Sequence, residues 1–354
     1  MKMEFEGAKI SGVHLVVPKN EISFESEIDQ YTFSAAQSRK LKSVMGYDRR
    51  RVVEPGVVSS DLVISGFKHL IINENLDLES IDALVLVTQT PDYLIPGTSF
   101  IVHNALPFKK DIVCMDLNQG CSGFINGMIA SLSLLEQRNI NRVALVNVDV
   151  LSRLVAFGDR NSRPIIGDAA SITIVDSNES SSSISCVSKV DGSGWDALMI
   201  PAGGMKMRPS DETAESREDE SGNVRSLNDL VMKGDAVFNF VMKEVPLLIE
   251  DICLDSQLSK VDIDYFVFHQ PNPFMLKKIA NKLEIPLAKM PHKLVSEFGN
   301  SSGVSIPAVL CTSFERQEFD VGKKMCLAGF GVGLSWGAMV MELEKLEFLS
   351  LSQF

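Results

Sequence analysis

The chain of 354 residues lacks the features that mark a membrane, secreted or nucleic-acid-binding protein. No apolar run reaches the ~18–20 residues that a membrane-spanning helix needs. Basic residues are outnumbered, 34 Lys and Arg against 46 Asp and Glu, and the net charge of −12 argues against a broad nucleic-acid-binding face. Residues 1–6 include acidic side chains where a secretory signal has a basic start and an apolar stretch. These absences predict a soluble, cytoplasmic protein.

Cysteine is scarce and never closely spaced. The six cysteines occur singly, with no CxxC pair and no histidine close by, so the sequence suggests neither a zinc site nor a disulfide framework. Five lie in apolar runs and are expected to be small buried side chains, namely Cys114, Cys186, Cys253, Cys311 and Cys326. Cys121 differs, because glycine and polar residues surround it. We therefore expect no bound metal and take Cys121 as a candidate for chemistry.

The chain alternates short apolar runs with amphipathic segments. Apolar residues recur at three- and four-residue spacing in Phe124–Glu136 and Phe274–Leu283, which predicts helices. Between such segments lie runs expected to be buried strands: Ile10–Val17, Ile81–Thr88, Ile112–Met115, Val143–Val148, Ser171–Val175, Ile184–Val190, Tyr265–Phe268, Met325–Ala328 and Ala338–Leu343. The alternation predicts an α/β fold with helices on both faces of mainly parallel sheets.

Two such series of strands suggest two α/β halves. The Ser-rich stretch Asn178–Ser183 is the expected joint, so we divide the chain into residues 1–180 and residues 181–354. Each half also has a glycine-containing segment before an apolar strand, Gly167–Ala170 in the first and Gly333–Gly337 in the second. This similarity is a weak sign of duplication.

The segment around Cys121 has the composition of a turn that carries a nucleophile. Residues 116–124, D-L-N-Q-G-C-S-G-F, follow a predicted strand and begin a predicted helix. Gly120 and Gly123 would permit a sharp turn with unusual backbone angles. At the positive end of the helix, free N–H groups and the helix dipole would stabilise a thiolate and so lower the pKa of Cys121. The pattern indicates a cysteine nucleophile or, as the alternative, a close helix–strand contact.

Two later segments supply partners for a cysteine nucleophile. His269 directly follows the predicted strand Tyr265–Phe268 and begins the polar string H-Q-P-N. Asn300 lies in a turn of small polar residues before the apolar helix expected at Val304–Phe314. The other four histidines have no such context and are expected to be structural.

Five segments, spread over most of the chain, resemble the β-ketoacyl-[acyl carrier protein] synthase III family of the thiolase superfamily. They are D-x-N-x-G-C-S-G-F around Cys121, G-D-A-A from Gly167, H-Q-P-N from His269, G-N-S-S-G-V-S-I-P from Gly299 and G-F-G-V-G-L-S-W-G from Gly329. The resemblance implies a thiolase-like α/β fold with five layers, αβαβα, made of two similar halves. It also implies a homodimeric acyltransferase of fatty acid biosynthesis that needs no metal or redox cofactor.

Carried over residue by residue, the resemblance implies a catalytic triad of Cys121, His269 and Asn300. The thiolate of Cys121 would attack an acyl thioester, and the backbone N–H groups of Cys121 and Val332 would form the oxyanion hole. His269 and Asn300 would donate hydrogen bonds to the thioester carbonyl of an incoming malonyl group as carbon dioxide leaves. The implied reaction condenses a Cys-bound acyl starter with malonyl-acyl carrier protein.

The sequence departs from the family pattern where coenzyme-A-primed members hold the adenine. Those members carry W-I-x-x-R-T-G-I near the N-terminus, whereas this chain has Lys40 in place of the Trp and Val44 in place of the Arg. A stacking aromatic residue contributes ~1–3 kcal/mol per base, so an acetyl-CoA primer is put in doubt. Both acyl-CoA and acyl-carrier thioesters stay open as donors, and so do the chain length and the acceptor.

Four further residues are candidates by position. Ile95 lies in the loop Thr90–Gly97, which in family members reaches across the two-fold axis to line the partner's acyl tunnel; the alternative is a loop packed on its own subunit. Arg153 matches a basic residue near the family's tunnel mouth; the alternative is a surface arginine with no special role. Lys277 and Lys278, on the helix after H-Q-P-N, are candidates for docking an acidic acyl carrier protein despite the charge of −12, or else ordinary surface residues.

Alternative functions remain beside decarboxylative condensation. A specialised acyltransferase or synthase of the same fold would pass the Cys121-bound acyl group to another acceptor. A non-catalytic partner subunit would have no need of Cys121, His269 and Asn300 together. A cysteine hydrolase fits poorly, because thiolase-type sites exclude water through a narrow tunnel.

Overall fold

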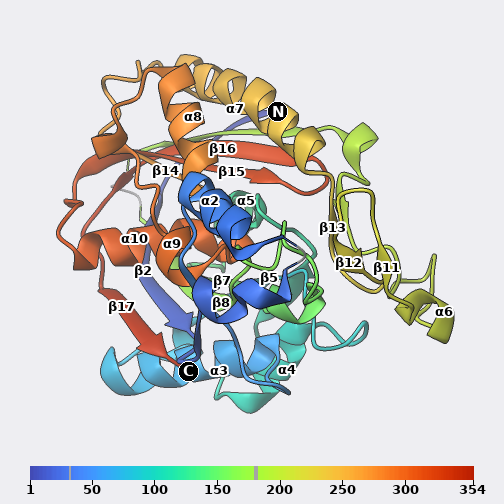
Figure 1. Ribbon diagram of the computed structural model, residues 1–354. Coiled ribbons are helices and arrows are strands. Elements are labelled where there is room, and N and C mark those ends of the chain that lie inside the picture. Colours follow the sequence, from blue (N-terminus) through green and yellow to red (C-terminus); the bar gives the residue numbers. More distant parts are fainter. Residues whose placement is uncertain (32, 179–181) are drawn as a thin grey trace.

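Two β-sheets alternate with three layers of helices (Figure 1). The structure, a computed structural model, describes residues 1–31, 33–178 and 182–354. Upward through Figure 1 lie α3 (Ser59–Asn73) with α4 (Thr98–Ala105), the six-stranded sheet, α5 (Gly123–Leu135) with α10 (Ser305–Glu315), the five-stranded sheet, and α7 (Gly234–Asp255) with α8 (Pro273–Leu283). Helices α5 and α10 contact strands of both sheets. The expected five-layered αβαβα architecture is confirmed.

The two sheets exchange the strands nearest the ends of the chain. The six-stranded sheet has the order β17 (Phe348–Gln353), β2 (Ala8–Val17), β8 (Ala169–Ser177), β7 (Arg142–Asp149), β5 (Ala83–Val87) and β6 (Val113–Leu117). The five-stranded sheet has the order β1 (Lys2–Phe5), β9 (Ile184–Val190), β16 (Ser335–Leu343), β15 (Lys323–Gly331) and β14 (Tyr265–Phe268). A division at residue 180 therefore leaves β1 and β17 each in the sheet formed mainly by the other half. Of the expected joint, residues 179–181 lie outside the described residues.

The expectation of mainly parallel sheets is wrong for the five-stranded sheet. There only β14 and β15 are parallel, whereas the six-stranded sheet combines parallel β7, β5 and β6 with an antiparallel β8. Strands β15 and β16 are separated only by residues 332–334, too few for the crossover that parallel strands need. The apolar runs on which the expectation rested report burial on both faces and say nothing of strand direction.

The remaining elements surround this frame. They are α1 (Phe24–Glu27), α2 (Ala35–Met45), α6 (Asp211–Ala214), α9 (Val295–Phe298), and the strand pairs β3 (Glu21–Ser23) with β4 (Arg49–Arg51), β10 (Leu198–Met199) with β13 (Val231–Met232), and β11 (Arg217–Glu218) with β12 (Val224–Arg225). Helix α6 and the pair β11–β12 form an arm that projects to the right in Figure 1. Among the described residues, no helix has the length and apolarity to cross a membrane.

Helix α5 lies at the centre of the main hydrophobic core. Phe124, Ile125 and Met128 are fully buried there, between strands of both sheets. Gly127 lets the helix approach β7, because a Cβ at this position would lie only 2.5 Å from Cδ1 of Leu145. A helix that is covered on several sides holds its own N-terminal end rigidly. Cys121 lies two residues before that end.

A second close approach joins the segment before β8 to the turn that carries Asn300. The backbone N–H of Gly167 donates to the carbonyl of Asn300 over 3.1 Å, and the N–H of Asn300 donates to the carbonyl of Ile165 over 2.7 Å. A Cβ on Gly167 would lie 2.2 Å from the carbonyl oxygen of Phe298. The glycine of the G-D-A-A string is therefore required by contact with backbone, which cannot rotate away as a side chain can.

We predict that Gly167→Ala destabilises the protein by about 1–3 kcal/mol, the usual cost of overpacking, and displaces the Asn300 turn. Urea unfolding measures the free energy of unfolding. Gly204→Ala is the matched control, since no atom lies within 4 Å of the added Cβ and its stability should change by less than about 0.5 kcal/mol. Equal stability of the two variants would contradict the contact described here.

Candidate functional site

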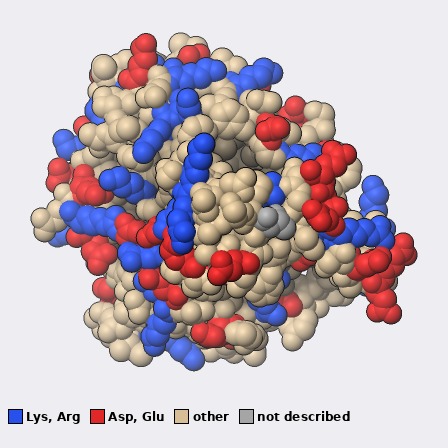
Figure 2. All heavy atoms as spheres, viewed as in Figure 1, with Lys and Arg blue, Asp and Glu red and all other residues tan. Residues whose placement is uncertain are grey.

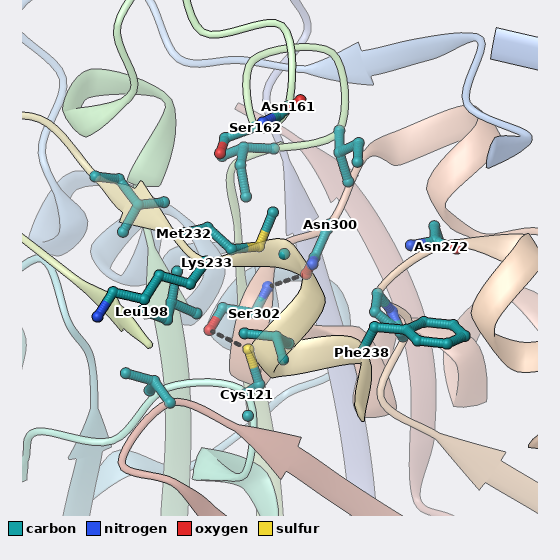
Figure 3. A pocket seen from close by; sticks show the side chains of 18 of the residues that line it. Cys121, Asn161, Ser162, Leu198, Met232, Lys233, Phe238, Asn272, Asn300 and Ser302 are labelled. Atoms are coloured by element: carbon teal, nitrogen blue, oxygen red, sulfur yellow. Dashed lines mark hydrogen bonds between the residues drawn. The ribbon is translucent and has the colours of Figure 1, made fainter. Parts of the chain in front are cut away.

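A cavity of about 1230 Å³ brings together residues from both halves of the chain (Figure 3). Cys121 follows β6, His269 follows β14, Val332 follows β15, and Asn300 lies beyond α9; all four line the cavity. Much of the remaining wall is apolar and comes from the segments around β10, β13 and the start of α7 and α8, including Leu198, Met199, Leu230, Met232, Phe238, Val241 and Phe274. The four residues expected to act together thus face one enclosed space.

The turn that carries Cys121 has ordinary backbone angles. Neither Gly120 nor Gly123 has a positive φ, so the expectation of unusual angles at these glycines is wrong. Close packing requires them instead: a Cβ on Gly120 would lie 2.3 Å from Cγ1 of Val332, and one on Gly123 would lie 2.8 Å from Cγ1 of Val87. The close helix–strand contact, which is the alternative interpretation of the motif, is therefore present, and it places Cys121 at the wall of the cavity.

The expectation of a lowered pKa at Cys121 is also wrong. Burial, together with the nearby Asp149 carboxylate, raises the pKa of this thiol to about 11. Against this, the Ser302 hydroxyl and the backbone N–H groups of Val332 and Cys121 favour the thiolate. Helix α5 begins only at Gly123, so its dipole does not offset the loss of hydration at the enclosed sulfur. The sulfur consequently holds its proton at neutral pH and needs a base to lose it.

His269 is buried and neutral, with its tautomer set by a hydroxyl. Its Nδ1 lies 2.8 Å from Oγ of Ser305, whose own proton is donated to the carbonyl of Ser302 over 2.8 Å. The Ser305 oxygen must then accept, so Nδ1 carries the ring proton and Nε2 the lone pair. Burial lowers the pKa of His269 to about 3. His269 can therefore accept a proton at Nε2, and it can donate from Nε2 only after it has done so.

Asn300 presents an amide of fixed orientation. Its Oδ1 accepts a hydrogen bond from the backbone N–H of Ser302 over 2.9 Å, as Figure 3 shows. Because the oxygen is occupied in this way, the amide Nδ2 is the atom available to donate into the cavity. This is the donor role that the resemblance implied for Asn300.

A buried polar chain beneath Cys121 was not found from the sequence. Asp149, 2% exposed at the end of β7, accepts hydrogen bonds from the backbone N–H of Gln89 over 2.8 Å and from its Nε2 over 3.2 Å. The same Nε2 donates to Oγ of Ser302 over 2.9 Å, and that hydroxyl lies 3.9 Å from Sγ of Cys121. Burial raises the pKa of Asp149 to about 7. The one sequence signal for this polar chain was Asp149 itself, an acidic residue at the end of a mainly apolar strand.

The residues assigned by position alone lie outside the cavity wall. Ile95 is 87% exposed, and Arg153 donates from its guanidinium to the carbonyl of Val57 over 2.9 Å; neither lines the cavity in the described part of the chain. Lys277 and Lys278 are exposed on α8. The amine of Lys278 lies 5.6 Å from the ring centre of Phe274, which does line the cavity.

The positions that depart from the family pattern lie on the outer side of α2. Lys40 and Val44 are both exposed, and neither lines the cavity. Leu41 and Met45, on the same helix, face the cavity instead. On this face of the molecule, basic side chains gather over α2 and α8 beside a hollow, and acidic ones gather on the projecting arm (Figure 2).

Comparison with known proteins agrees with this geometry. A sequence model of 3-oxoacyl-[acyl-carrier-protein] synthase III matches residues 115–192, and one of its C-terminal part matches residues 253–343. The β-ketoacyl-[acyl-carrier-protein] synthase III of Fusobacterium nucleatum is 30% identical over 94% of this chain and 98% of its own length. The enzyme of that name from Clostridium perfringens is 30% identical over 96% of this chain and 100% of its own length.

Solved structures resemble this fold over nearly the whole chain. A 3-oxoacyl-(acyl-carrier protein) synthase from Burkholderia xenovorans matches with a TM-score of 0.91 and 29% identity, covering 100% of this chain and 99% of that one. Another 3-oxoacyl-(acyl-carrier-protein) synthase III matches with a TM-score of 0.90 and 29% identity over 95% of this chain. Since sequence and fold agree over nearly the whole of both chains, this protein belongs to the β-ketoacyl-[acyl-carrier-protein] synthase III family.

Proposed function

We propose that the protein is a condensing enzyme in which Cys121 carries an acyl starter and joins it to a malonyl-acyl carrier protein. One observation carries the proposal. A cysteine, a neutral histidine with a free Nε2, and an amide with a free Nδ2 line the same cavity, beside two backbone N–H groups that favour negative charge at the sulfur. This set supplies a nucleophile, a base and donors for a developing negative charge.

In the first half-reaction the acyl group is transferred to sulfur. Nε2 of His269 takes the proton of Cys121, and the thiolate attacks the carbonyl carbon of the donor thioester. The backbone N–H groups of Cys121 and Val332 stabilise the oxyanion of the tetrahedral intermediate. When it collapses, the donor's thiolate leaves with a proton from His269, and the acyl group stays on Cys121 as a thioester.

In the second half-reaction the malonyl group supplies a carbon nucleophile. The bond to its carboxylate carbon breaks, carbon dioxide leaves, and the electron pair becomes an enolate on the thioester. Nδ2 of Asn300 donates to the enolate oxygen. Nε2 of His269 donates as well once it has taken a proton from solvent, and it passes that proton to the Cys121 thiolate at the end of the step. The enolate carbon attacks the Cys121 acyl group, a carbon–carbon bond forms, and the thiolate of Cys121 is released. The reaction needs no redox cofactor, because oxidation of the carboxylate carbon to carbon dioxide is balanced by reduction of the acyl carbon from the thioester to the ketone level.

The donor or the acceptor, or both, arrive on an acyl carrier protein in this proposal. Lys40 and Val44 provide no aromatic platform for an adenine at the positions where the family pattern places it. The basic side chains of α2 and α8 lie beside the hollow in Figure 2, which suits an acidic carrier. A cavity of about 1230 Å³ is at the upper end for small-molecule sites and has room for an acyl chain together with a pantetheine arm.

We also propose a homodimer, formed through the edge of the six-stranded sheet, that acts in the cytoplasm. Strand β6 is the last strand of that sheet, and among the described residues nothing pairs with its outer edge. Tyr93, Leu94 and Ile95 are 64%, 63% and 87% exposed in the loop beside it. Asp116 of β6 accepts hydrogen bonds from the N–H groups that begin α4, which holds the loop against this edge. An exposed apolar loop next to an open strand edge favours pairing with a second copy.

We predict that Cys121→Ser abolishes covalent loading without unfolding the protein, because the hydroxyl keeps the shape of the thiol but is a far weaker nucleophile. Intact-mass measurement after incubation with a panel of acyl-CoA and acyl-carrier donors records the loading. Cys114→Ser, a half-exposed cysteine on β6, is the control and should load like the wild type. Acyl groups on the sulfur of the Cys121→Ser protein would rule out the assignment.

We predict that Ile95→Trp shortens the acyl chain that the enzyme accepts, because the larger side chain would intrude into the partner's tunnel. Competition between donors of increasing chain length gives the profile, and sedimentation gives the oligomeric state. Ile72→Trp, at an isoleucine 75% exposed on α3, is the matched control. An unchanged profile in a dimeric Ile95→Trp protein would count against this placement of the loop.

We predict that Lys277→Glu/Lys278→Glu slows the reaction with acyl carrier protein, chiefly through the association rate, while loading from an N-acetylcysteamine thioester stays the same. Added salt should weaken the wild-type carrier reaction, since exposed charges are screened beyond about 8–10 Å. Lys68→Glu/Lys110→Glu makes the same charge change at two exposed lysines that do not line the cavity, one on α3 and one between α4 and β6, and should leave both rates unchanged. Equal losses with both substrates would point to damage within the cavity instead of docking.

A further inference from the structure

Ser302 is hydrogen-bonded to Cys121 and Asn300, and it is linked to His269 through the hydroxyl of Ser305. It begins the 3₁₀ turn Ser302–Val304, and its backbone N–H donates to Oδ1 of Asn300 over 2.9 Å. Its hydroxyl donates to Sγ of Cys121 over 3.9 Å, and Figure 3 shows both contacts. Its carbonyl accepts the proton of Ser305, the hydroxyl that meets Nδ1 of His269. Three different atoms of one residue thus meet three different members of the site.

The backbone of Ser302 is held in an unfavourable conformation. Its φ of 55° lies in the left-handed region, which residues with a side chain seldom adopt, and the residue is 2% exposed. Such a conformation persists only where the surrounding contacts require it, and it is found preferentially at functional sites. Here it points the N–H, the carbonyl and the hydroxyl toward Asn300, Ser305 and Cys121 respectively.

The direction of the Ser302 hydroxyl proton is set by Gln89 and Asp149. One hydrogen on Nε2 of Gln89 goes to Oδ2 of Asp149 over 3.2 Å, and the other goes to Oγ of Ser302 over 2.9 Å. Because the Ser302 oxygen accepts a hydrogen bond on this side, its own proton is left for donation to Sγ of Cys121, 3.9 Å away. The Asp149 carboxyl competes for this proton, since the Ser302 hydroxyl also lowers the pKa of Asp149. The backbone N–H of Gln89 also donates to Asp149, so the side chain is anchored at both ends.

We propose that Ser302 is a positioning residue that orients the nucleophile, the amide and the histidine together, and that the buried Gln89–Asp149 pair fixes the direction of its hydroxyl. The roles of the three oriented groups rest on the proposed function. The Ser302 hydroxyl favours the thiolate of Cys121, which agrees with its lowering effect on the pKa of that thiol. The N–H bond to Asn300 leaves Nδ2 to donate, and the Ser305 contact keeps the proton of His269 on Nδ1.

The pH dependence of Cys121 reactivity tests this role. Besides the hydroxyl, the negative charge of Asp149 raises the pKa of the thiol, and His269 lies across the cavity, whose described wall also includes Lys233 and Asp235. The Ser302 hydroxyl also lowers the pKa of Asp149, so the profiles of wild type and variant are compared at the upper end of the pH range, where this carboxyl is ionised in both proteins. The rate of alkylation of Cys121 by iodoacetamide is measured in short pulses from about pH 7 to pH 11, and peptide mapping separates Cys121 from the half-exposed Cys114.

We predict that Ser302→Ala moves the alkylation profile up by about one pH unit, which corresponds to about tenfold slower alkylation at a fixed pH below the midpoint. Gln89→Leu should move it in the same direction by a smaller amount, because the hydroxyl is then free to rotate. Ser301→Ala is the matched control: it changes the preceding buried serine of the same turn, which does not line the cavity, and the profile should not move.

Two results would overturn the proposal. Wild-type profiles in both Ser302→Ala and Gln89→Leu would show that the hydroxyl does not act on the sulfur. An equal shift in Ser301→Ala would assign the effect to packing of the turn. If Ser302→Ala does not fold, Gln89→Leu alone decides, since it leaves the backbone of the turn unchanged. The alkylation assay uses no acyl donor, so failure of Cys121 to load an acyl group would be seen separately as failure of the proposed function.

Discussion

The contact between the Cys121 turn and the end of β15 is the constraint on which the rest of the site depends. A Cβ on Gly331 would lie 2.9 Å from Sγ of Cys121, and one on Gly329 would lie 2.9 Å from Cα of Ser122. Side chains at these glycines would push the two halves of the molecule apart. Because all four residues of β14 pair with β15, and the N–H of His269 donates to the carbonyl of Ala328, the same contact sets how near His269 comes to the cysteine. The glycines of the motif around Cys121 and of the motif from Gly329 thus allow the two segments to approach each other closely. The chemistry depends on the short distance between Cys121 and the end of β15 that these glycines permit.

Burial then decides the protonation states of Cys121 and His269 before a substrate binds. The same loss of hydration that raises the pKa of Cys121 lowers that of His269, so both side chains are neutral before a substrate arrives. At these two side chains charge appears only as the reaction proceeds, next to donors that already point at it. Preorganised donors of this kind cost no reorganisation when the charge develops.

The sequence was enough to place the strands of the two sheets other than β1 and β17, the central helix, and four of the residues that line the cavity, because each of these leaves a local pattern. The direction of a strand leaves no such local pattern. The pKa of Cys121 leaves none either, because it depends on burial by segments that are far away in the chain. The polar chain was missed for the same reason: Gln89 and Asp149 are 60 residues apart, and Gln89 and Ser302 are 213 apart. Strands β1 and β17 alternate apolar and polar residues. They therefore lack the continuous apolar runs by which the other strands were found.

The exchange of β1 and β17 between the sheets has a consequence for how the chain reaches its folded state. Strand β2 lies beside β17, and the side chain of His14 bonds Ser350, which is 336 residues away along the chain. Pairing of such distant segments needs closure of almost the whole chain as one loop, and contacts of this kind slow folding. During synthesis the six-stranded sheet stays open at β2 until residues 348–353 have been made. The edge of the six-stranded sheet at β2 is therefore completed only by the last part of the chain to be made, which couples the first half of the molecule to the second.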